Sequence, residues 1–321
     1  MVKRILRVLL SGLFVLYLIL AAFNLQSEKQ KTENFIPLGK IYVVSGKQVH
    51  LYCLGNSLPG EPTVILEAGT GDNHMTWYGL QQDISRTVQV CSYDRLGYGW
   101  SDSSRGPRSV ELIAGELFKL LKTAQIQPPY VLAGHSFGGL VMHYFAARYP
   151  ETVLGLVLVD ATPAATLLER QSGIRQPLLL VPPALTGLAA LTQSAGLFQW
   201  AYENNLFDPF EALDPLPAQI RPQAEALYFR TRTLAASAVE QLYLGQSARL
   251  AVNLPLPDDL PVVAFISGLE GIAGMLPEIQ AEFSSLTANS QVSILPNSHY
   301  LHLERPDLVQ RAIETMVSAG Q

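Results

Sequence analysis

Short apolar runs and longer apolar stripes take turns along the chain, which predicts alternating strands and helices. Two runs, 40–44 and 47–54, flank Ser45-Gly46 and predict a β-hairpin. Further runs of strand length lie at 63–67, before Tyr93-Asp94, and at 130–133, 153–159, 260–268 and 291–295. Apolar residues at helical spacing occur at 76–86, at 110–124, at 276–286 and after Pro306. This alternation predicts βαβ units, and so a mostly parallel eight-stranded sheet with helices on both faces.

The pattern changes between residues 163 and 255. This stretch is rich in proline, alanine and leucine, and it predicts helices within 177–202, 219–234 and 236–251. It is too long for a single crossover between two strands. We interpret 163–255 as a helical lid inserted after the sixth strand, which leaves 39–162 and 256–321 as the core. Ordinary helices that cover the sheet are the alternative.

The first 25 residues predict a membrane anchor or signal segment. Lys3, Arg4 and Arg7 precede an apolar run from 8 to 23, and polar residues follow from Asn24. The run is longer than an ordinary signal core but slightly shorter than an average transmembrane helix, and no clear cleavage site follows it. We favour an uncleaved anchor with its basic end in the cytoplasm and the body of the chain outside, joined by a polar tether over 26–38. A cleaved signal and a secreted protein are the alternative.

Composition restricts the partners and cofactors. The formal net charge is −5, and no basic cluster lies beyond the extreme N-terminus, which argues against nucleic acid as a partner. The sequence contains no H-E-x-x-H motif, no paired C-x-x-C and no phosphate-binding glycine loop, so neither a metal nor a nucleotide cofactor is predicted. The two cysteines, Cys53 and Cys91, lie in strand-like stretches. In an exported protein they can form a disulfide, and two buried free thiols are the alternative.

The candidate chemistry centres on Gly134-His135-Ser136-Phe137-Gly138, which follows a strand-like run and precedes a helical pattern. This G-x-S-x-G pattern is typical of the nucleophile elbow, a strand-to-helix turn that exposes a serine oxygen. The glycines flank a strained serine and leave room for the neighbouring strand and helix. In this context the motif predicts a nucleophilic Ser136. A glycine-rich turn with an incidental serine is the alternative.

Two further stretches accompany the elbow: Y-D-R-L-G-Y-G-W-S-D at 93–102 and N-S-H-Y-L-H-L-E-R-P-D at 297–307. With this order and spacing, the chain after residue 40 resembles the α/β-hydrolase superfamily, in particular its lid-containing, serine-nucleophile esterases and lipases. The resemblance implies the α/β-hydrolase fold and a Ser-His-acid triad.

His299 is the candidate base, because it stands where the family carries its catalytic histidine. His302, three residues later, is the rival and matches a structural position. The acid departs from the commonest family pattern, because Gly271 occupies its usual place after the seventh strand. Asp160, at the end of the sixth strand, and Glu270 remain as candidates, and we favour Asp160.

The resemblance also implies an oxyanion hole formed by two backbone amides. One is the N–H of Phe137, after the nucleophile, and the other is the N–H of Thr70, in the glycine-rich loop after the third strand. Asp94 and Arg95 are interpreted as structural residues that brace the loop from 96 to 102.

These features predict a serine hydrolase that cleaves a carboxylic ester or related acyl bond through an acyl-enzyme, without a cofactor. The apolar stretch from Leu178 to Trp200 suggests a hydrophobic, lipid-like substrate. The same fold and triad also support a cofactor-free haloperoxidase, a thioesterase, an amidase or a carbon–carbon hydrolase. A non-catalytic binding protein is a further alternative.

Overall fold

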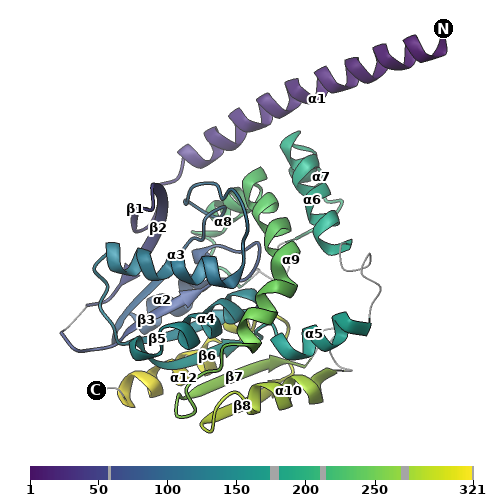
Figure 1. Cartoon of the computed structure of the whole chain (residues 1–321). Helices are drawn as coiled ribbons and strands as arrows, with labels where there is room; N and C mark the ends of the chain where they lie inside the picture. Colours follow the sequence, from purple (N-terminus) through teal and green to yellow (C-terminus); the bar gives the residue numbers. More distant parts are fainter. Residues whose placement is uncertain (57–58, 174–180, 210–214, 269–274, 320–321) are drawn as a thin grey trace.

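The computed structural model describes the whole chain except residues 57–58, 174–180, 210–214, 269–274 and 320–321. In this described part of the chain, eight strands form one sheet in the order β1-β2-β4-β3-β5-β6-β7-β8 (Figure 1). The pairs β1–β2 and β2–β4 are antiparallel, and all the others are parallel. The strands are β1 (Lys40–Val44), β2 (Lys47–Leu54), β3 (Thr63–Glu67), β4 (Gln89–Tyr93), β5 (Tyr130–His135), β6 (Val153–Val159), β7 (Val262–Ser267) and β8 (Ser290–Leu295). The predicted fold class is thereby confirmed.

Helices cover both faces of this sheet. Successive strand residues point to opposite sides, so Val64 and Leu66 pack in one hydrophobic layer while Ile65 packs in the other. The helices of the core are η1 (His74–Trp77), α2 (Tyr78–Ile84), α3 (Val110–Thr123), α4 (Phe137–Arg148), η2 (Pro150–Thr152), α10 (Leu276–Ser284), α11 (Leu301–Glu304) and α12 (Pro306–Ala319). The layer with Val64 includes residues of α2 and α12, and the layer with Ile65 includes residues of α3, α4 and α10.

A second group of helices lies between β6 and β7. These are α5 (Ala164–Gly173), α6 (Val181–Ser194), α7 (Leu197–Glu203), α8 (Arg221–Tyr228) and α9 (Thr231–Val252). Helix α8 packs over η1, in a small apolar cluster that contains Met75 and Leu227. The helices therefore occupy the predicted insertion, and their action as a lid stays a prediction. Residues 177–180 of that prediction lie outside the described residues.

The break between α8 and α9 falls at residues 229–230, several residues before the break that the sequence predicts. A remote residue explains the position. Oε1 of Glu28 accepts hydrogen bonds from the Thr231 N–H at 3.0 Å and from the Thr231 hydroxyl at 2.7 Å. A carboxylate at the first turn satisfies free amides and interacts favourably with the helix dipole, so α9 begins there.

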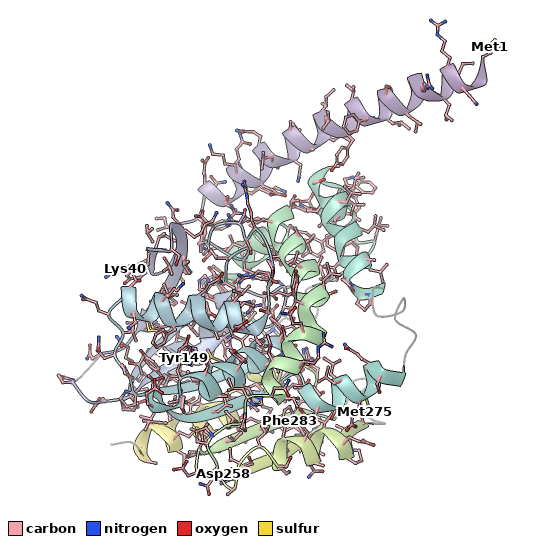
Figure 2. All side chains as sticks on the ribbon, in the orientation of Figure 1. Met1, Lys40, Tyr149, Asp258, Met275 and Phe283 are labelled. Carbon is pink, nitrogen blue, oxygen red and sulfur yellow. A yellow bond between two sulfur atoms is a disulfide. The ribbon has the colours of Figure 1, made fainter. Side chains whose placement is uncertain are left out.

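Helix α1 (Val2–Glu33) projects from the body of the molecule with its N-terminus farthest away (Figure 1). Figure 2 shows Met1 at this free end, far from Lys40, where the sheet begins. The segment Lys3–Glu33 is long and apolar enough to cross a membrane, a test that a signal sequence also passes. Helix α1 continues without a break through Glu33, so residues 26–33 of the expected polar tether are helical.

Cys53 and Cys91 lie opposite each other in the register of β2 and β4. Their Sγ atoms are 2.06 Å apart, which is disulfide distance.

Candidate active site

Ser136 joins β5 to α4 with an unusual backbone conformation, φ 53° and ψ −124°. Few side-chain-bearing residues adopt this region, and it persists only where the surroundings hold it. The Ser136 N–H donates to the carbonyl of Val159 at 3.1 Å, and the Ser136 carbonyl accepts from the amides of Gly139 and Thr162. The turn is therefore fixed by both the helix that follows and the end of β6.

The elbow glycines stand where no side chain fits. A Cβ at Gly138 would lie 2.4 Å from the carbonyl oxygen of Ala68, and one at Gly134 would lie 2.5 Å from the carbonyl oxygen of Gly138. The elbow is thus pressed against the end of β3, the strand that leads into the loop with Thr70.

His299 and Asp160 meet at the carboxyl edge of the sheet. Nδ1 of His299 lies 2.5 Å from Oδ2 of Asp160. The other carboxylate oxygen accepts the Ser267 N–H at 2.7 Å, and the Asp160 N–H donates to Phe265 at 2.7 Å. Asp160 also has a positive φ of 42°. Neighbouring strands therefore fix the carboxylate so that it faces the imidazole, as an orienting acid requires. Glu270 lies outside the described residues.

His135, inside the elbow motif, connects the nucleophile turn to the loop of His299. Its Nε2 lies 3.0 Å from the carbonyl oxygen of His299, and its ring centroid is 4.5 Å from the His299 ring. Burial lowers the pKa of His135, so the ring is neutral and donates through Nε2. The sequence predicts only a local role for His135 within the elbow. No spacing rule relates it to a residue 164 positions later.

The rival histidine, His302, is enclosed by aromatic rings. It lies 4.3 Å from Trp77 and 4.5 Å from His135, measured between ring centroids. Among the described residues, neither of its nitrogens has a hydrogen-bond partner. Burial holds the pKa of His302 well below its usual value, which fits a neutral packing residue.

The two predicted oxyanion donors lie on adjoining elements. Phe137 is the first residue of α4, and Thr70 follows β3 in the loop against which Gly138 packs. Among the residues that the structure describes, neither backbone N–H donates to another protein group. The Thr70 hydroxyl is occupied, because it donates to Oε2 of Glu240 at 3.0 Å.

Arg95 stabilises the loop that contains Thr70 through hydrogen bonds to its backbone. Its guanidinium donates to the carbonyls of Ala68 at 2.6 Å and Gly69 at 2.8 Å. It also contacts two carboxylates, Glu67 at 2.5 Å and Glu240 at 2.9 Å. Arg95 also stacks on the Tyr98 ring, 4.8 Å from its centroid, so it contacts its own loop as expected and braces the predicted oxyanion loop and helix α9 as well.

Glu67 and Glu240 share this one cation in a site closed to solvent. Burial raises the pKa of Glu67 to about 7, against the opposing effects of Arg95 and of the Tyr93 hydroxyl. The pKa of Arg95 stays well above its usual value, because its two carboxylate partners outweigh the effect of burial. Sequence reasoning missed both glutamates, since neither belongs to a motif.

Asp94 braces the loop from 96 to 102. Its carboxylate accepts the N–H of Trp100 at 2.9 Å, and a Cβ at Gly99 would lie 2.1 Å from it. His74 and His50 lie on its other side, with ring nitrogens 3.0 and 2.9 Å from its oxygens. This trio has residue types that can ligate a metal. The carboxylate already accepts hydrogen bonds from backbone and imidazole groups, so we interpret the trio as structural.

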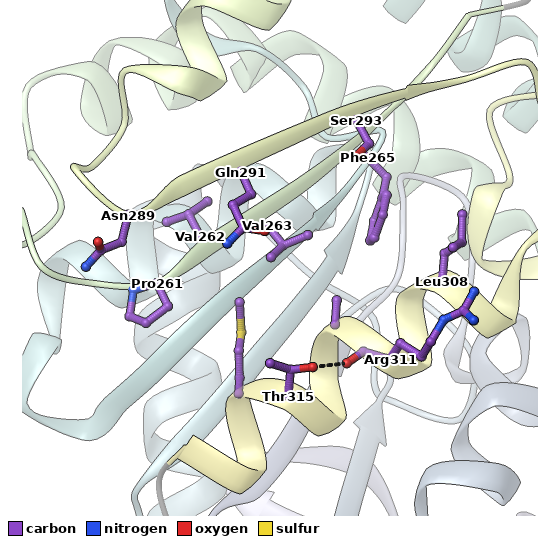
Figure 3. Close-up of a pocket in the computed structure, with 12 residues that line it drawn as sticks. Pro261, Val262, Val263, Phe265, Asn289, Gln291, Ser293, Leu308, Arg311 and Thr315 are labelled. Atoms are coloured by element: carbon purple, nitrogen blue, oxygen red, sulfur yellow. Dashed lines mark hydrogen bonds between the residues drawn. The ribbon is translucent and has the colours of Figure 1, made fainter.

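A cavity of about 300 Å³ lies elsewhere, between β7, β8 and α12. Figure 3 shows Phe265 and Val263 facing Leu308, Arg311 and Thr315 across it. Its lining contains no serine–histidine pair, and Arg311 is bound to Asp307 at 2.7 Å. The candidate active site is therefore the edge with Ser136 and His299, not this cavity.

Comparisons with known proteins identify the fold of the chain. Residues 62–306 match the alpha/beta hydrolase fold family. YqjL of Bacillus subtilis is 34% identical over 121 residues, which cover 38% of this chain and 47% of YqjL. Rv2715 of Mycobacterium tuberculosis is 28% identical over 293 residues, which cover 84% of this chain and 80% of that protein. Matches to the first curated relatives span less than half of their length, 47% of YqjL and 32% of a Schizosaccharomyces pombe protein.

Solved structures show the same fold. An enol-lactonase from Burkholderia xenovorans has a TM-score of 0.65 at 18% identity, over 87% of this chain and 100% of its own. A thermophilic esterase from Thermogutta terrifontis has a TM-score of 0.65 at 18% identity, over 88% and 99%. With its sheet order, its serine elbow and the family match over 62–306, the chain belongs to the α/β-hydrolase fold family.

Proposed function

We propose that this α/β hydrolase cleaves a carboxylic ester or related acyl bond, with Ser136 as nucleophile, His299 as base and Asp160 as the orienting acid. The observation that best supports the proposal is the 2.5 Å contact between His299 Nδ1 and Asp160. With Nδ1 held by the carboxylate, Nε2 is the nitrogen that takes the serine proton. The strained turn at Ser136 suits a nucleophile that must be held in one orientation.

In this mechanism, the Ser136 oxygen attacks the acyl carbon while His299 takes the hydroxyl proton. The negative charge that develops on the acyl oxygen is stabilised by the amides of Phe137 and Thr70. His299 then returns the proton to the leaving group, and water, activated by the same imidazole, releases the acyl group from Ser136. Asp160 stabilises the charged imidazole in both steps. No step requires a cofactor.

The proposed substrate carries a hydrophobic acyl or alcohol group, because apolar helices lie between β6 and β7. Support comes from Met75 and Leu227, which belong to a buried apolar cluster beside the loop after β3. A panel of chromogenic esters, thioesters and amides of increasing chain length separates this proposal from the other acyl-transfer reactions that the fold supports. Turnover that falls steeply with chain length contradicts the hydrophobic substrate.

The proposal is tested by labelling the full-length protein with a fluorophosphonate probe, which reacts with activated serines. We expect labelling of the wild type and none of Ser136→Ala. Ser285→Ala, which changes an exposed serine after α10, is the matched control and keeps full labelling. Asp160→Asn is expected to lower the rate of labelling roughly 10³–10⁴-fold, because the imidazole then loses the partner that fixes its tautomer.

Two results contradict the proposal. Labelling that persists in Ser136→Ala excludes this serine as the nucleophile. Labelling that is unchanged in Asp160→Asn excludes Asp160 as the acid, and Glu270→Gln then tests the other candidate.

A further inference from the structure

Helices α6 and α7 carry an exposed apolar face. Leu191 and Trp200 are each 55% exposed, and Leu185, Leu188 and Leu197 are exposed to a similar degree. Residues 181–202 contain no charged side chain. A run of large apolar side chains without charges is unusual on a surface that faces water, and it marks an interaction surface.

Helix α1 contacts the ends of α6 and α7 and leaves their apolar face exposed. The Tyr17 hydroxyl is 2.6 Å from the Ser194 hydroxyl at the end of α6, and the Asn24 side chain donates to the carbonyl of Gln193 at 2.6 Å. Farther along α1, Lys31 pairs with Glu203 at the end of α7 at 3.2 Å. Figure 1 shows α6 and α7 reaching toward α1 on the side away from β8.

The order of these contacts matches the layers of a membrane. Tyr17 lies within the apolar run that ends at Phe23, about 9 Å from that end at 1.5 Å per residue. Asn24 begins the polar part of α1, and the pair Lys31–Glu203 is exposed. Helix α7 runs between the levels of Asn24 and Lys31, and it carries Trp200, a residue type that is enriched at membrane interfaces.

We infer that the α6–α7 face rests in the outer leaflet of the bilayer that α1 crosses. The end of α6 then lies between the depths of Tyr17 and Asn24, at the boundary of the hydrocarbon region, while α7 lies at the headgroup level. The apolar face is buried in lipid, which is favourable in proportion to the area removed from water. On the proposed function, this position allows acyl substrates to reach the helices around Ser136 directly from the leaflet.

Depth-dependent quenching tests the position. The full chain with Leu191→Cys, Trp200→Cys or Ile294→Cys is labelled with an environment-sensitive fluorophore in detergent. It is then reconstituted in phosphatidylcholine vesicles that contain acyl-chain spin-labelled phosphatidylcholine. Ile294 is the control, because it is an exposed apolar residue on β8, at the opposite end of the molecule. We expect several-fold stronger quenching at 191 than at 294, with 200 intermediate.

Quenching at 191 no stronger than at 294 overturns the inference. The inference is also overturned if the label at 191 is shielded in detergent because a second copy of the chain covers this face. Chemical crosslinking detects such a dimer. The measurement does not require catalysis, so a failed probe reaction at Ser136 leaves its result intact.

The link to substrate is tested with Leu191→Glu. Turnover of a long-chain ester in the vesicles is expected to fall several-fold, while that of a short water-soluble ester stays unchanged. Equal loss for both esters contradicts delivery from the leaflet.

Discussion

At the residue scale, Glu67 makes a pH-dependent contribution to stability. The folded protein raises the pKa of Glu67 to about 7 from an ordinary value of 4.5, so the native state binds this proton more tightly than the unfolded chain does. The contribution to the free energy of unfolding is therefore complete below about pH 4.5 and lost as the pH rises through about 7. Its size is about 3–4 kcal/mol.

Urea unfolding of the full chain in detergent, at pH 5 and pH 8, measures this effect. We expect the wild type to lose stability relative to Glu67→Gln between these pH values, because glutamine does not titrate. Glu278→Gln, on the exposed side of α10, is the control and keeps the pH dependence of the wild type. If the free energies of unfolding of the wild type and Glu67→Gln differ by the same amount at both pH values, the Glu67 carboxyl does not take up a proton in the folded protein over this range.

The sequence was sufficient to propose Ser136, His299 and Asp160, because its resemblance to the α/β-hydrolase superfamily implies a triad at these positions. Each of them also follows a strand, and strand ends gather at one edge of a parallel sheet. It left Asp160 and Glu270 open, since the choice depends on which carboxylate points at the imidazole. It gave no sign of Glu240, which meets Arg95 across 145 positions of sequence. A lone glutamate in a helix ordinarily faces water, and only the fold shows that this one is buried.

At the element scale, Glu240 joins α9 to the loop after β3. Its carboxylate binds Arg95 through both oxygens and also accepts the hydroxyls of Tyr98 and Thr70. In Glu240→Gln, Arg95 keeps Glu67 as a carboxylate partner, while the hydroxyls of Tyr98 and Thr70 lose their charged acceptor. We expect this change to lower the free energy of unfolding by about 1–3 kcal/mol, the cost of leaving buried polar groups poorly paired.

The matched control is Glu225→Gln on α8, whose partner Arg221 is partly exposed. Partly exposed pairs contribute little, so we expect a loss of at most about 1 kcal/mol. Chemical unfolding followed by tryptophan fluorescence compares the two variants. Equal losses contradict the role of Glu240 as the link between α9 and the core.

Element boundaries followed the sequence wherever local signals define them. The strands at 63–67 and 153–159 begin and end where the apolar runs do, and Pro306 starts α12. The start of α9 differs from the sequence prediction, because the group that accepts the hydrogen bond of the Thr231 N–H is Glu28, on a different helix. Local sequence cannot reveal a cap that arrives from 203 positions away.

At the scale of the whole molecule, contacts run without a gap from α1 to the candidate site. Glu28 on α1 accepts a hydrogen bond from Thr231 at the start of α9. Glu240, also on α9, forms an ion pair with Arg95. Arg95 in turn holds the carbonyls of Ala68 and Gly69, beside the proposed oxyanion donor. Helix α1 and the candidate active site are thus linked by contacts, which fits the proposal of an enzyme that works at a fixed distance from a membrane.

This arrangement makes a prediction about where the body folds. The basic residues Lys3, Arg4 and Arg7 favour a cytoplasmic N-terminus, which places the sheet and both cysteines outside the cytoplasm. Disulfides persist in such compartments and are rare in the cytosol. We therefore expect the protein, acid-quenched from cells, to take no thiol-reactive mass tag before reduction and two afterwards.

Replacing the three basic residues by glutamate is the control, because it weakens export and leaves reduced thiols that are tagged directly. Two tags on the unreduced wild-type protein contradict both the bond and the orientation, since Cys53 and Cys91 are paired in the register of β2 and β4 and stay reduced only in a reducing compartment.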